Sequence, residues 1–443
     1  MKISLALFHL IYLGRLLNQT LIINVIWVNS VLIQFYFLIL QKINVMALFN
    51  DFNFKDRKAI LRVDFNVPLN KETFEITDDK RMQAALPTIN KIISDGGSVI
   101  IISHLGRPKN GPDLSFSLKH LTNHLEKITK RKVLFADDCI GEQAKTLSKN
   151  LNIGEILLLE NVRFYKEETK GDINFAQQLA VLGDCYVNDA FGTAHRAHAS
   201  TAHIASCFSL ENKMCGLLMT AEIESARKVM EETQRPFTAI VGGAKVSDKV
   251  LIVENLMKVA DHIIIGGGMA YTFKKALGGK IGASLCENDR IETCKEILSK
   301  AADLGVEIHL PVDSIVANTF SADAKIDVAN SDEIAEDWMG LDIGPTAAQH
   351  FTQIIEHSKT ILWNGPMGVF ELKPFEEGTK SIANAVARAT KKGGYSLIGG
   401  GDSAAAAKKF EVVKKISHVS TGGGALLEYF EGKELPGIAA INK

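Results

Sequence analysis

Glycine-rich turns recur in the second half of the chain, each after a run of apolar residues. Where a strand ends in glycines and a helix follows, backbone N–H groups point outward beside the positive end of the helix dipole, and together they can bind a phosphate. A single such turn is equally well explained as a plain strand-to-helix connection, but four in one half of the chain favour a phosphate site. The four turns are Gly242-Gly243-Ala244-Lys245, Gly266-Gly267-Gly268, Gly399-Gly400-Gly401-Asp402-Ser403 and Gly422-Gly423-Gly424.

Three charged residues beside these turns could act on a phosphate. The carboxylate of Asp402 could hold Mg²⁺, which usually joins protein to nucleotide phosphates in this way; an ordinary helix N-cap is the alternative. Lys245 and Lys249 share one helical face if the helix begins within the glycines; solvated surface lysines are the alternative. No turn matches G-x-x-x-x-G-K-[ST], or G-x-G-x-x-G followed by an acidic residue about 20 positions on, so neither a P-loop nor a Rossmann dinucleotide site is indicated.

Arginine and histidine residues recur at the ends of apolar runs in the first half of the chain, where a hydrophobic core disfavours them. Planar guanidinium groups bind carboxylate and phosphate through paired hydrogen bonds, so several in one cleft suit a substrate that carries both groups. Taken singly, each is more simply a solvent-exposed strand end, but their recurrence points to a shared site. The residues are Arg62, Asp64 and Asn66 in RVDFNVP, His104 and Arg107 in SHLGRP, Arg163 in LENVRF, and His195, Arg196 and His198 in FGTAHRAHAS.

Other binding classes find little support in the composition. His195, His198 and His203 lack cysteine or carboxylate companions at the usual spacing, which argues against zinc there. The six cysteines form no C-x-x-C pair and are sparse for 443 residues, so a reducing compartment is favoured over a disulfide framework. A net charge of −1 does not indicate nucleic acid or an acidic membrane as partner, so any anion site must be local.

Short apolar runs alternate with longer periodic stretches after residue 46, which predicts an α/β fold with parallel sheets. The runs barely alternate with polar residues, as expected of strands buried on both faces. The predicted strands are 59–65, 98–104, 155–161, 185–189, 237–243, 262–267, 306–313, 360–365 and 395–400. The predicted helices include 222–234, 247–260, 288–304, 376–391 and 403–410.

The chain is long enough for two domains, and a polar helical segment offers the division between them. The segment 217–235 reads as one helix that ends where Arg235 meets Pro236, and a new strand begins at once. No long Gly/Ser linker or repeat is present, so this helix would have to join the domains, and a hinge role is expected of it.

The first 45 residues differ from the rest, because residues 16–40 carry no charged side chain and are long enough to cross a bilayer. A secretory signal would need a small-residue cleavage site, and a transit peptide would be rich in Arg and Ser; neither pattern is present. A membrane anchor stays open. We favour a third interpretation, in which translation begins at Met46 and the apolar prefix is upstream sequence read in frame.

The motifs together resemble the phosphoglycerate kinase family from about residue 50 to the end of the chain. The matching segments, in the order the family has them, are RVDFNVP, SHLGRP, LLLENVRF, NDAFGTAHRAH, VGGAKVSDK, GGGMAYTF, WMGLDIGP, LWNGPMGVFE, GGGDSAAA and SHVSTGGGA. The resemblance implies two doubly wound parallel-sheet domains joined by a helix and hinge, with 3-phosphoglycerate on the first and the nucleotide on the second. The implied division is an extension over 1–45, an N-terminal domain over 46–218, an interdomain helix over 219–235, a nucleotide domain over 236–425, and a segment over 426–443 that returns to the first domain.

The resemblance also implies site residues at matching positions. Those for 3-phosphoglycerate are Asp64, Phe65, Asn66, Arg81, His104, Leu105, Gly106, Arg107, Arg163 and Arg196, bordered by Arg62 and His195. Those for the nucleotide are Lys249, Gly340, Glu371, Gly400, Gly401, Asp402 and Ser403, with Asp402 as the Mg²⁺ ligand. The implied catalytic residues are Lys245, on the phosphoryl group in transit, with Arg81, Gly401 and Gly424. Ser403 stands where the family usually has threonine, which keeps the hydroxyl, and Leu426 where it often has serine.

The implied reaction is reversible phosphoryl transfer between 1,3-bisphosphoglycerate with ADP and 3-phosphoglycerate with ATP, run toward ATP in glycolysis. We expect in-line transfer after hinge closure, a cytoplasmic monomer, and no nucleic-acid or membrane partner. A scaffold protein that kept the fold but lost the chemistry would be expected to lack Lys245, Asp402 or the arginines, and all are present. A nicotinamide-dependent dehydrogenase would need the dinucleotide fingerprint, which is missing.

Overall fold

The computed structural model describes residues 49–109 and 111–443. The apolar run at 16–40 and the proposed start at Met46 lie outside the described residues. Within the described part of the chain, no helix has both the length and the apolar character needed to cross a membrane.

The first half of the chain forms a six-stranded, fully parallel sheet in the order β3-β4-β2-β1-β5-β6. Its central strands are buried along their whole length, which confirms why their sequences do not alternate. β3 and β6 were not predicted, because one is short and partly exposed and the other begins with a lysine. The strands are β1 (Lys58–Arg62), β2 (Ser98–Ile102), β3 (Val133–Ala136), β4 (Ile156–Leu159), β5 (Cys185–Asn188) and β6 (Lys213–Cys215).

The second half forms another six-stranded parallel sheet, in the order β10-β8-β7-β15-β16-β17. Five of its strands were predicted, and only the two-residue strand β17 was missed. The strands are β7 (Phe237–Val241), β8 (His262–Ile265), β10 (Glu307–His309), β15 (Thr360–Asn364), β16 (Tyr395–Ile398) and β17 (His418–Val419).

Helices cover both faces of each sheet, so the predicted doubly wound fold is confirmed. In β1, Ala59 and Leu61 pack with α3 residues, whereas Ile60 packs on the opposite face with α7 residues. The helices are α3 (Lys80–Ser94), α4 (Thr122–Thr129), α5 (Glu142–Lys149), α6 (Lys166–Lys170), α7 (Ile173–Ala180), α8 (Leu217–Met230), α9 (Val250–Leu256), α10 (Met269–Ala276), α11 (Ile291–Leu304), α12 (Pro345–His357), α13 (Glu377–Lys391), α14 (Gly401–Lys409), α15 (Gly423–Phe430) and α16 (Pro436–Asn442).

Two small sheets in the second half were not predicted from the sequence. One is antiparallel, in the order β12-β11-β14, and the other pairs β13 with β9. Their strands are short and β12 is largely exposed, so no continuous apolar run marks them. They are β9 (Lys280–Ile281), β11 (Asp313–Ala317), β12 (Ile326–Asn330), β13 (Glu333–Ile334) and β14 (Met339–Ile343).

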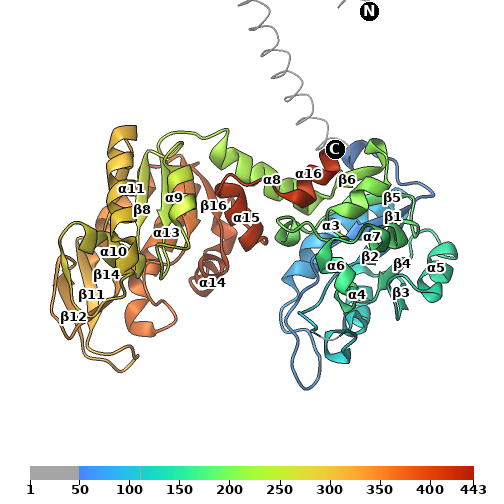
Figure 1. Cartoon of the computed structure of the whole chain (residues 1–443), viewed down its shortest axis with the longest axis horizontal. Coiled ribbons are helices and arrows are strands. Elements are labelled where there is room, and N and C mark those ends of the chain that lie inside the picture. The colour runs from blue at the N-terminus through green and yellow to red at the C-terminus, as the bar shows by residue number, and fades with distance from the viewer. Residues whose placement is uncertain (1–48, 110) are drawn as a thin grey trace, which may run out of the picture.

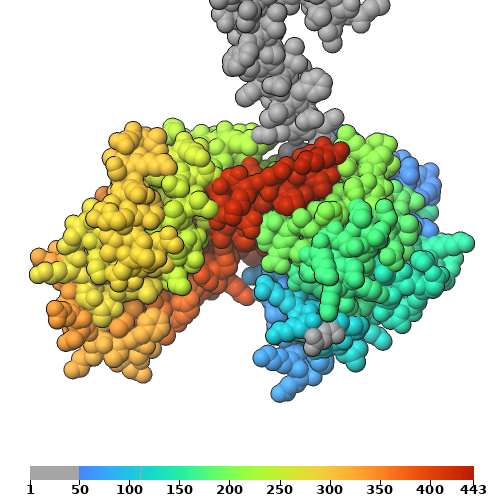
Figure 2. Space-filling view, viewed as in Figure 1, coloured from blue at the N-terminus to red at the C-terminus, as the bar shows by residue number. Residues whose placement is uncertain are grey.

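Helix α8 and the C-terminal segment connect the two lobes (Figure 1). The first turn of α8 is held by the first lobe, because Leu217 N donates to Thr88 Oγ1 at 3.0 Å and Met219 N to Asp189 Oδ1 at 3.0 Å. The C-terminal helix α16 also contacts the first lobe, where Gly437 N donates to the carbonyl of Ala194 at 2.8 Å. Figure 2 shows an open cleft between the lobes beneath this C-terminal segment.

Candidate active site

The basic residues of the first lobe follow the carboxyl ends of its parallel strands. β1 ends at Arg62, β2 is followed by His104, β4 by Arg163, and β5 by His195 and Arg196. Because β4, β2, β1 and β5 are neighbours in the sheet, their carboxyl ends bring these residues to one edge. The sheet order therefore gathers side chains that are far apart in the sequence.

Arg81, Asp64 and Asn66 form a network at this edge. Arg81 Nη1 donates to Asp64 Oδ1 at 3.1 Å and to the carbonyl of Asn66 at 3.0 Å, and it lies 3.0 Å from Asp64 Oδ2. The Asn66 side chain accepts from Gly106 N at 2.8 Å, which ties the loop after β1 to the loop after β2. The Arg81 side chain remains 39% exposed, so part of its guanidinium stays free for a ligand.

Arg62 and His104 are the buried floor of this site. Arg62 is fully buried, and its Nε donates to Ser200 Oγ at 2.8 Å, while Nη2 lies 3.4 Å from His104 Nδ1. Ser200 Oγ in turn donates to the buried carboxylate of Glu168 at 2.7 Å. Arg62 is thus held by an internal network and orients its neighbours, which suits the bordering position expected of it.

Arg163 carries the clearest sign of excess positive charge. Its Nη1 donates to the carbonyl of Gly106 at 2.8 Å, but its buried Nε has no hydrogen-bond partner within the described residues. Burial, followed by the nearby charges of Arg62 and Arg196, lowers the pKa of Arg163 from 12.5 to about 10. A buried donor without an acceptor costs free energy, so the site favours an anion that would supply one.

The histidines of the site are held neutral near pH 7. Burial, with the arginine charges behind it, lowers the pKa of His198 to about 4 and the pKa of His104 well below 6.5. Burial also lowers the pKa of His195, whose Nε2 lies 3.1 Å from Arg196 Nε. The positive charge offered to a ligand therefore comes from the arginines, and the histidines serve as neutral hydrogen-bonding groups.

The remaining substrate candidates contribute in different ways. The side chains of Phe65 and Leu105 are buried in the core, so they can offer a ligand only their backbone. Gly106 has a φ of 63°, and a Cβ there would lie 2.2 Å from Phe116, so this turn requires glycine. Arg107 is exposed and makes no hydrogen bond or ion pair inside the described ranges.

The second lobe holds a cavity of about 470 Å³, within the range of small-molecule sites. Of the predicted nucleotide residues, Gly340, Glu371 and Asp402 line it, together with Gly243, Gly267 and Gly268 of two predicted glycine turns. Its apolar lining was missed, since it comes from β14, from the loop after β15 and from other separate segments. The missed lining residues are Tyr271, Ala283, Leu285, Phe320, Met339, Leu341, Pro366, Met367, Gly368 and Val369.

Gly340 shapes this cavity by lacking a side chain. A Cβ added there would lie 1.9 Å from Tyr271 Oη, and Gly340 N donates to Ser284 Oγ at 2.9 Å. Tyr271 Oη itself donates to Ser314 Oγ at 3.0 Å, so the ring cannot easily move away. Any larger residue at position 340 would displace the aromatic wall.

The prediction that Lys245 and Lys249 share a helical face is wrong. α9 begins only at Val250, and Ser247 N donates instead to the side chain of Glu287 at 3.0 Å, which holds the preceding residues in a turn. Lys249 is half-buried and donates to Asn364 Oδ1, and burial lowers its pKa. Lys245 is exposed beside Ala244, which lines the cavity.

The turn between β16 and α14 presents an acidic residue at the cavity. Asp402 lies in the first turn of α14, is exposed, and its carboxylate makes no hydrogen bond within the part of the chain that the structure describes. Mg²⁺ is commonly bound by one or two carboxylates together with substrate phosphates and waters, so this free carboxylate fits that ion. Ser403 differs: its buried hydroxyl accepts from Gly365 N at 2.6 Å and supports the neighbouring loop.

Two glycines and one buried glutamate lie where the two lobes contact each other. A Cβ at Gly422 would lie 2.2 Å from the Phe191 ring, and one at Gly424 would lie 3.7 Å from His195. Glu222 of α8, which was not singled out in the sequence, is fully buried and accepts from Thr421 N at 2.7 Å and lies 3.0 Å from His418 Nε2. A buried carboxylate that holds the strand-end segment to the connecting helix is well placed to couple the lobes.

Comparisons with known proteins agree on one family. The family model described as phosphoglycerate kinase matches residues 49–433. A phosphoglycerate kinase from Porphyromonas gingivalis is 51% identical, covering 88% of this chain and 98% of its own, and one from Chloroherpeton thalassium is 48% identical, covering 89% and 98%. Two solved structures of phosphoglycerate kinases are also similar. The one from Coxiella burnetii is 40% identical with a TM-score of 0.81, and the one from Pyrococcus horikoshii is 31% identical with a TM-score of 0.74. Each match covers 88% of this chain and 97% of the other chain. The chain belongs to the phosphoglycerate kinase family.

Proposed function

We propose that this protein catalyses reversible phosphoryl transfer between 1,3-bisphosphoglycerate with ADP and 3-phosphoglycerate with ATP. One observation carries the proposal: the first lobe has an arginine-rich edge with an unpartnered buried donor, and the second lobe has a glycine-lined cavity. Two anionic substrates held on separate lobes are what a kinase with a small acidic metabolite requires.

The arginine-rich edge is the proposed site for 3-phosphoglycerate. Arg163 would give its free Nε–H to the ligand, and Arg81, which is partly exposed, would turn toward the cleft. Arginines suit this role because their planar fork matches both carboxylate and phosphate. Neutral His104 and His198 can act as hydrogen-bonding groups without competing for the anion's charge.

The cavity on the second lobe is the proposed nucleotide site. Its apolar walls suit a purine ring, and the turns at Gly243 and Gly268 offer backbone N–H groups for the phosphates. Asp402 would hold Mg²⁺, which when bound neutralises charge on the phosphate oxygens. Lys249 is close enough to feel the charge of Asp402, and it is half-buried. Its ammonium group would therefore act in a poorly hydrated setting.

The transfer step asks the protein for alignment and charge stabilisation. The carboxylate of 3-phosphoglycerate is already ionised at neutral pH, so it can attack the terminal phosphoryl group without a general base or a protein nucleophile. Closure of the lobes would bring exposed Lys245 to the phosphoryl group in transit and exclude water from the acyl phosphate. The N–H groups of Gly401 and Gly424 would complete the donors around that group.

The accompanying assignments follow the same reasoning. We propose the domains as 46–218 and 236–425, with 426–443 returning to the first domain. The connecting segment over 219–235, expected to be helical throughout, is helical only to the end of α8 at Met230. Both half-sites come from one chain, which supports a monomer. All six cysteines are free thiols, which supports a reducing compartment and a cytoplasmic location.

A coupled assay of ATP formation from 1,3-bisphosphoglycerate and ADP tests the proposal. The full chain should form ATP, and the Lys245→Ala variant, prepared in parallel, should lose the activity and so exclude a contaminating host kinase. Nucleotide binding without ATP formation would instead support a scaffold role. Reduction of a nicotinamide cofactor would support a dehydrogenase.

A further inference from the structure

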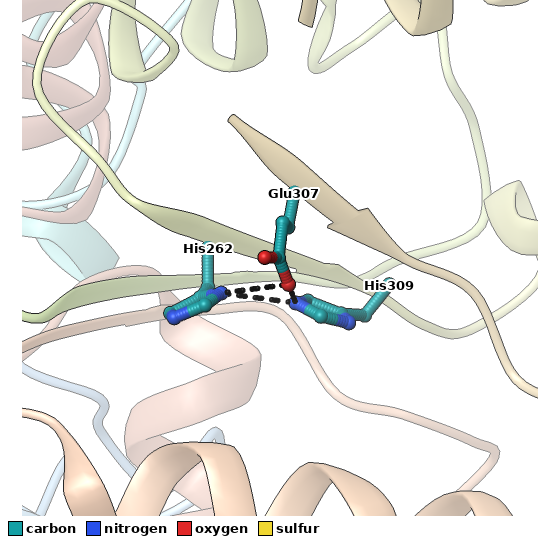
Figure 3. Close-up of side chains that lie close together, drawn as sticks. All are labelled: His262, Glu307 and His309. Carbon is teal, nitrogen blue, oxygen red and sulfur yellow. Dashed lines mark hydrogen bonds and ion pairs between the residues drawn. The ribbon is translucent and has the colours of Figure 1, made fainter. Parts of the chain in front are cut away.

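A cluster of side chains that could hold a metal ion lies at the end of the second-lobe sheet away from the cavity. His262 is the first residue of β8, and Glu307 and His309 lie on the edge strand β10 (Figure 3). His262 and Glu307 are paired in register, and His309 is two residues further on. Registered neighbours in a parallel sheet and residues two apart on a strand share one face, so all three side chains meet there.

The spacing of the three nearest atoms matches a tetrahedral metal site. His262 Nδ1 lies 3.2 Å from His309 Nε2, and Glu307 Oε2 lies 3.5 Å and 3.6 Å from these two nitrogens. Zinc bonds of about 2.0–2.2 Å to nitrogen and oxygen place neighbouring ligands of a tetrahedron roughly 3.3–3.5 Å apart. The three atoms therefore already stand close to three corners of such a tetrahedron.

Hydrogen bonding alone does not account for this arrangement. Only one proton can lie between His262 Nδ1 and His309 Nε2, and the distances to Glu307 are too long for good hydrogen bonds. When each imidazole carries its proton on the other ring nitrogen, both of these nitrogens and Glu307 Oε2 have lone pairs that a metal ion could use.

We propose that His262, Glu307 and His309 form a binding site for Zn²⁺, with water at the fourth position. Imidazole ligands suit Zn²⁺ and related transition metals, whereas Mg²⁺ prefers oxygen ligands, so this site differs in chemistry from Asp402. The side chain of Glu307 is 69% exposed, which leaves solvent access for a water ligand and for entry of the metal. His350 of α12 packs edge-on against His309 and lies outside the ligand group.

The site would fasten the edge of the sheet and take no part in phosphoryl transfer. The bound ion would clamp β10, a short strand at the sheet edge, to β8. β8 runs from His262 toward Gly267 of the cavity, and about 3.3 Å per residue puts the two sites more than ~13 Å apart. Because the ion would bind the folded state and not the unfolded chain, it would also raise the free energy of unfolding.

Equilibrium dialysis against buffered ZnCl₂, followed by metal analysis, tests the proposal on the full chain. Native protein should hold one more equivalent of zinc than Glu307→Gln or His309→Asn, and His357→Asn, which removes an exposed histidine elsewhere, should match native protein. Glu307→Gln changes an exposed side chain, so its fold should survive, and circular dichroism checks this. Its ATP-forming activity with Mg²⁺ and ADP should equal that of native protein.

Cobalt provides a second readout that zinc bound elsewhere would not mimic. Native protein loaded with Co²⁺ should show the strong visible bands of four-coordinate cobalt, and Glu307→Gln should lose them. Equal zinc contents in native protein and both cluster variants, or cobalt bands unchanged by Glu307→Gln, would overturn the assignment.

Discussion

Replacing Arg163 with alanine should separate ligand affinity from stability. The lowering of its pKa from 12.5 to about 10 corresponds to about 3 kcal/mol at ~1.4 kcal/mol per pH unit. Because the side chain is only half-buried, solvent screening reduces this to about 1–2 kcal/mol. The substitution removes this cost of holding the charge in the site. It also removes one hydrogen bond to Gly106, which contributes about 0.5–1.5 kcal/mol. The two effects nearly cancel, so the free energy of unfolding without ligand should change by less than ~1 kcal/mol.

The affinity for 3-phosphoglycerate should fall sharply in the same variant. Hydrogen bonds to charged groups contribute about 1.5–3 kcal/mol, so the loss of the Arg163 donors should weaken binding about 10- to 150-fold. Titration calorimetry measures the affinity, and urea unfolding in a buffer free of phosphate and sulfate measures the stability.

Arg131→Ala is the matched control, because Arg131 is an exposed arginine outside the site. It should leave both quantities unchanged. The reasoning fails if Arg163→Ala binds 3-phosphoglycerate as native protein does, or if it loses more than ~2 kcal/mol of stability relative to the control.

Four further predictions concern other parts of the molecule. Lys245→Ala should lower kcat more than ~100-fold with little loss of nucleotide affinity, because it removes a contact made in the transition state; near-normal turnover would exclude that role. Arg81→Ala should weaken 3-phosphoglycerate binding while ATP binding persists, and unchanged glycerate affinity in calorimetry would count against the assignment. Glu222→Ala leaves the partners of a buried carboxylate unpaired and should lower the free energy of unfolding by roughly 3 kcal/mol; a loss below ~1 kcal/mol in urea would contradict this. The pKa of His198 is about 4 in the folded chain and 6.5 in the unfolded chain, so the unfolded state takes up the proton first and stability should fall between pH 6.5 and 4; the fall should be smaller in His198→Asn.

Much of the secondary structure of the second lobe could be predicted, because the sequence patterns that mark its strands and turns are local. A strand buried on both faces leaves a continuous apolar run, and a glycine turn follows it directly in the sequence, so β7, β8 and β16 and their turns were all found. The antiparallel strands between 313 and 343 were not found, because β12 is exposed and the buried strands β11 and β14 are short and interrupted by polar residues or glycine. The helix around Lys249 was placed too early, since the side chain that holds Ser247 in a turn comes from Glu287, 40 residues away.

The sequence by itself determined the fold class, the two-domain plan, the family resemblance and the residues that we propose for both half-sites. Only the tertiary structure decided the apolar walls of the cavity, the burial of Glu222 between helix and strand end, and the meeting of His262 with His309 across paired strands. The physical reason is the separation of the interacting residues along the sequence. Strand burial, turn geometry and charge depend on near neighbours in the chain. A cavity wall, an unpaired buried donor or a set of side chains spaced for a metal ion exists only once distant segments pack together.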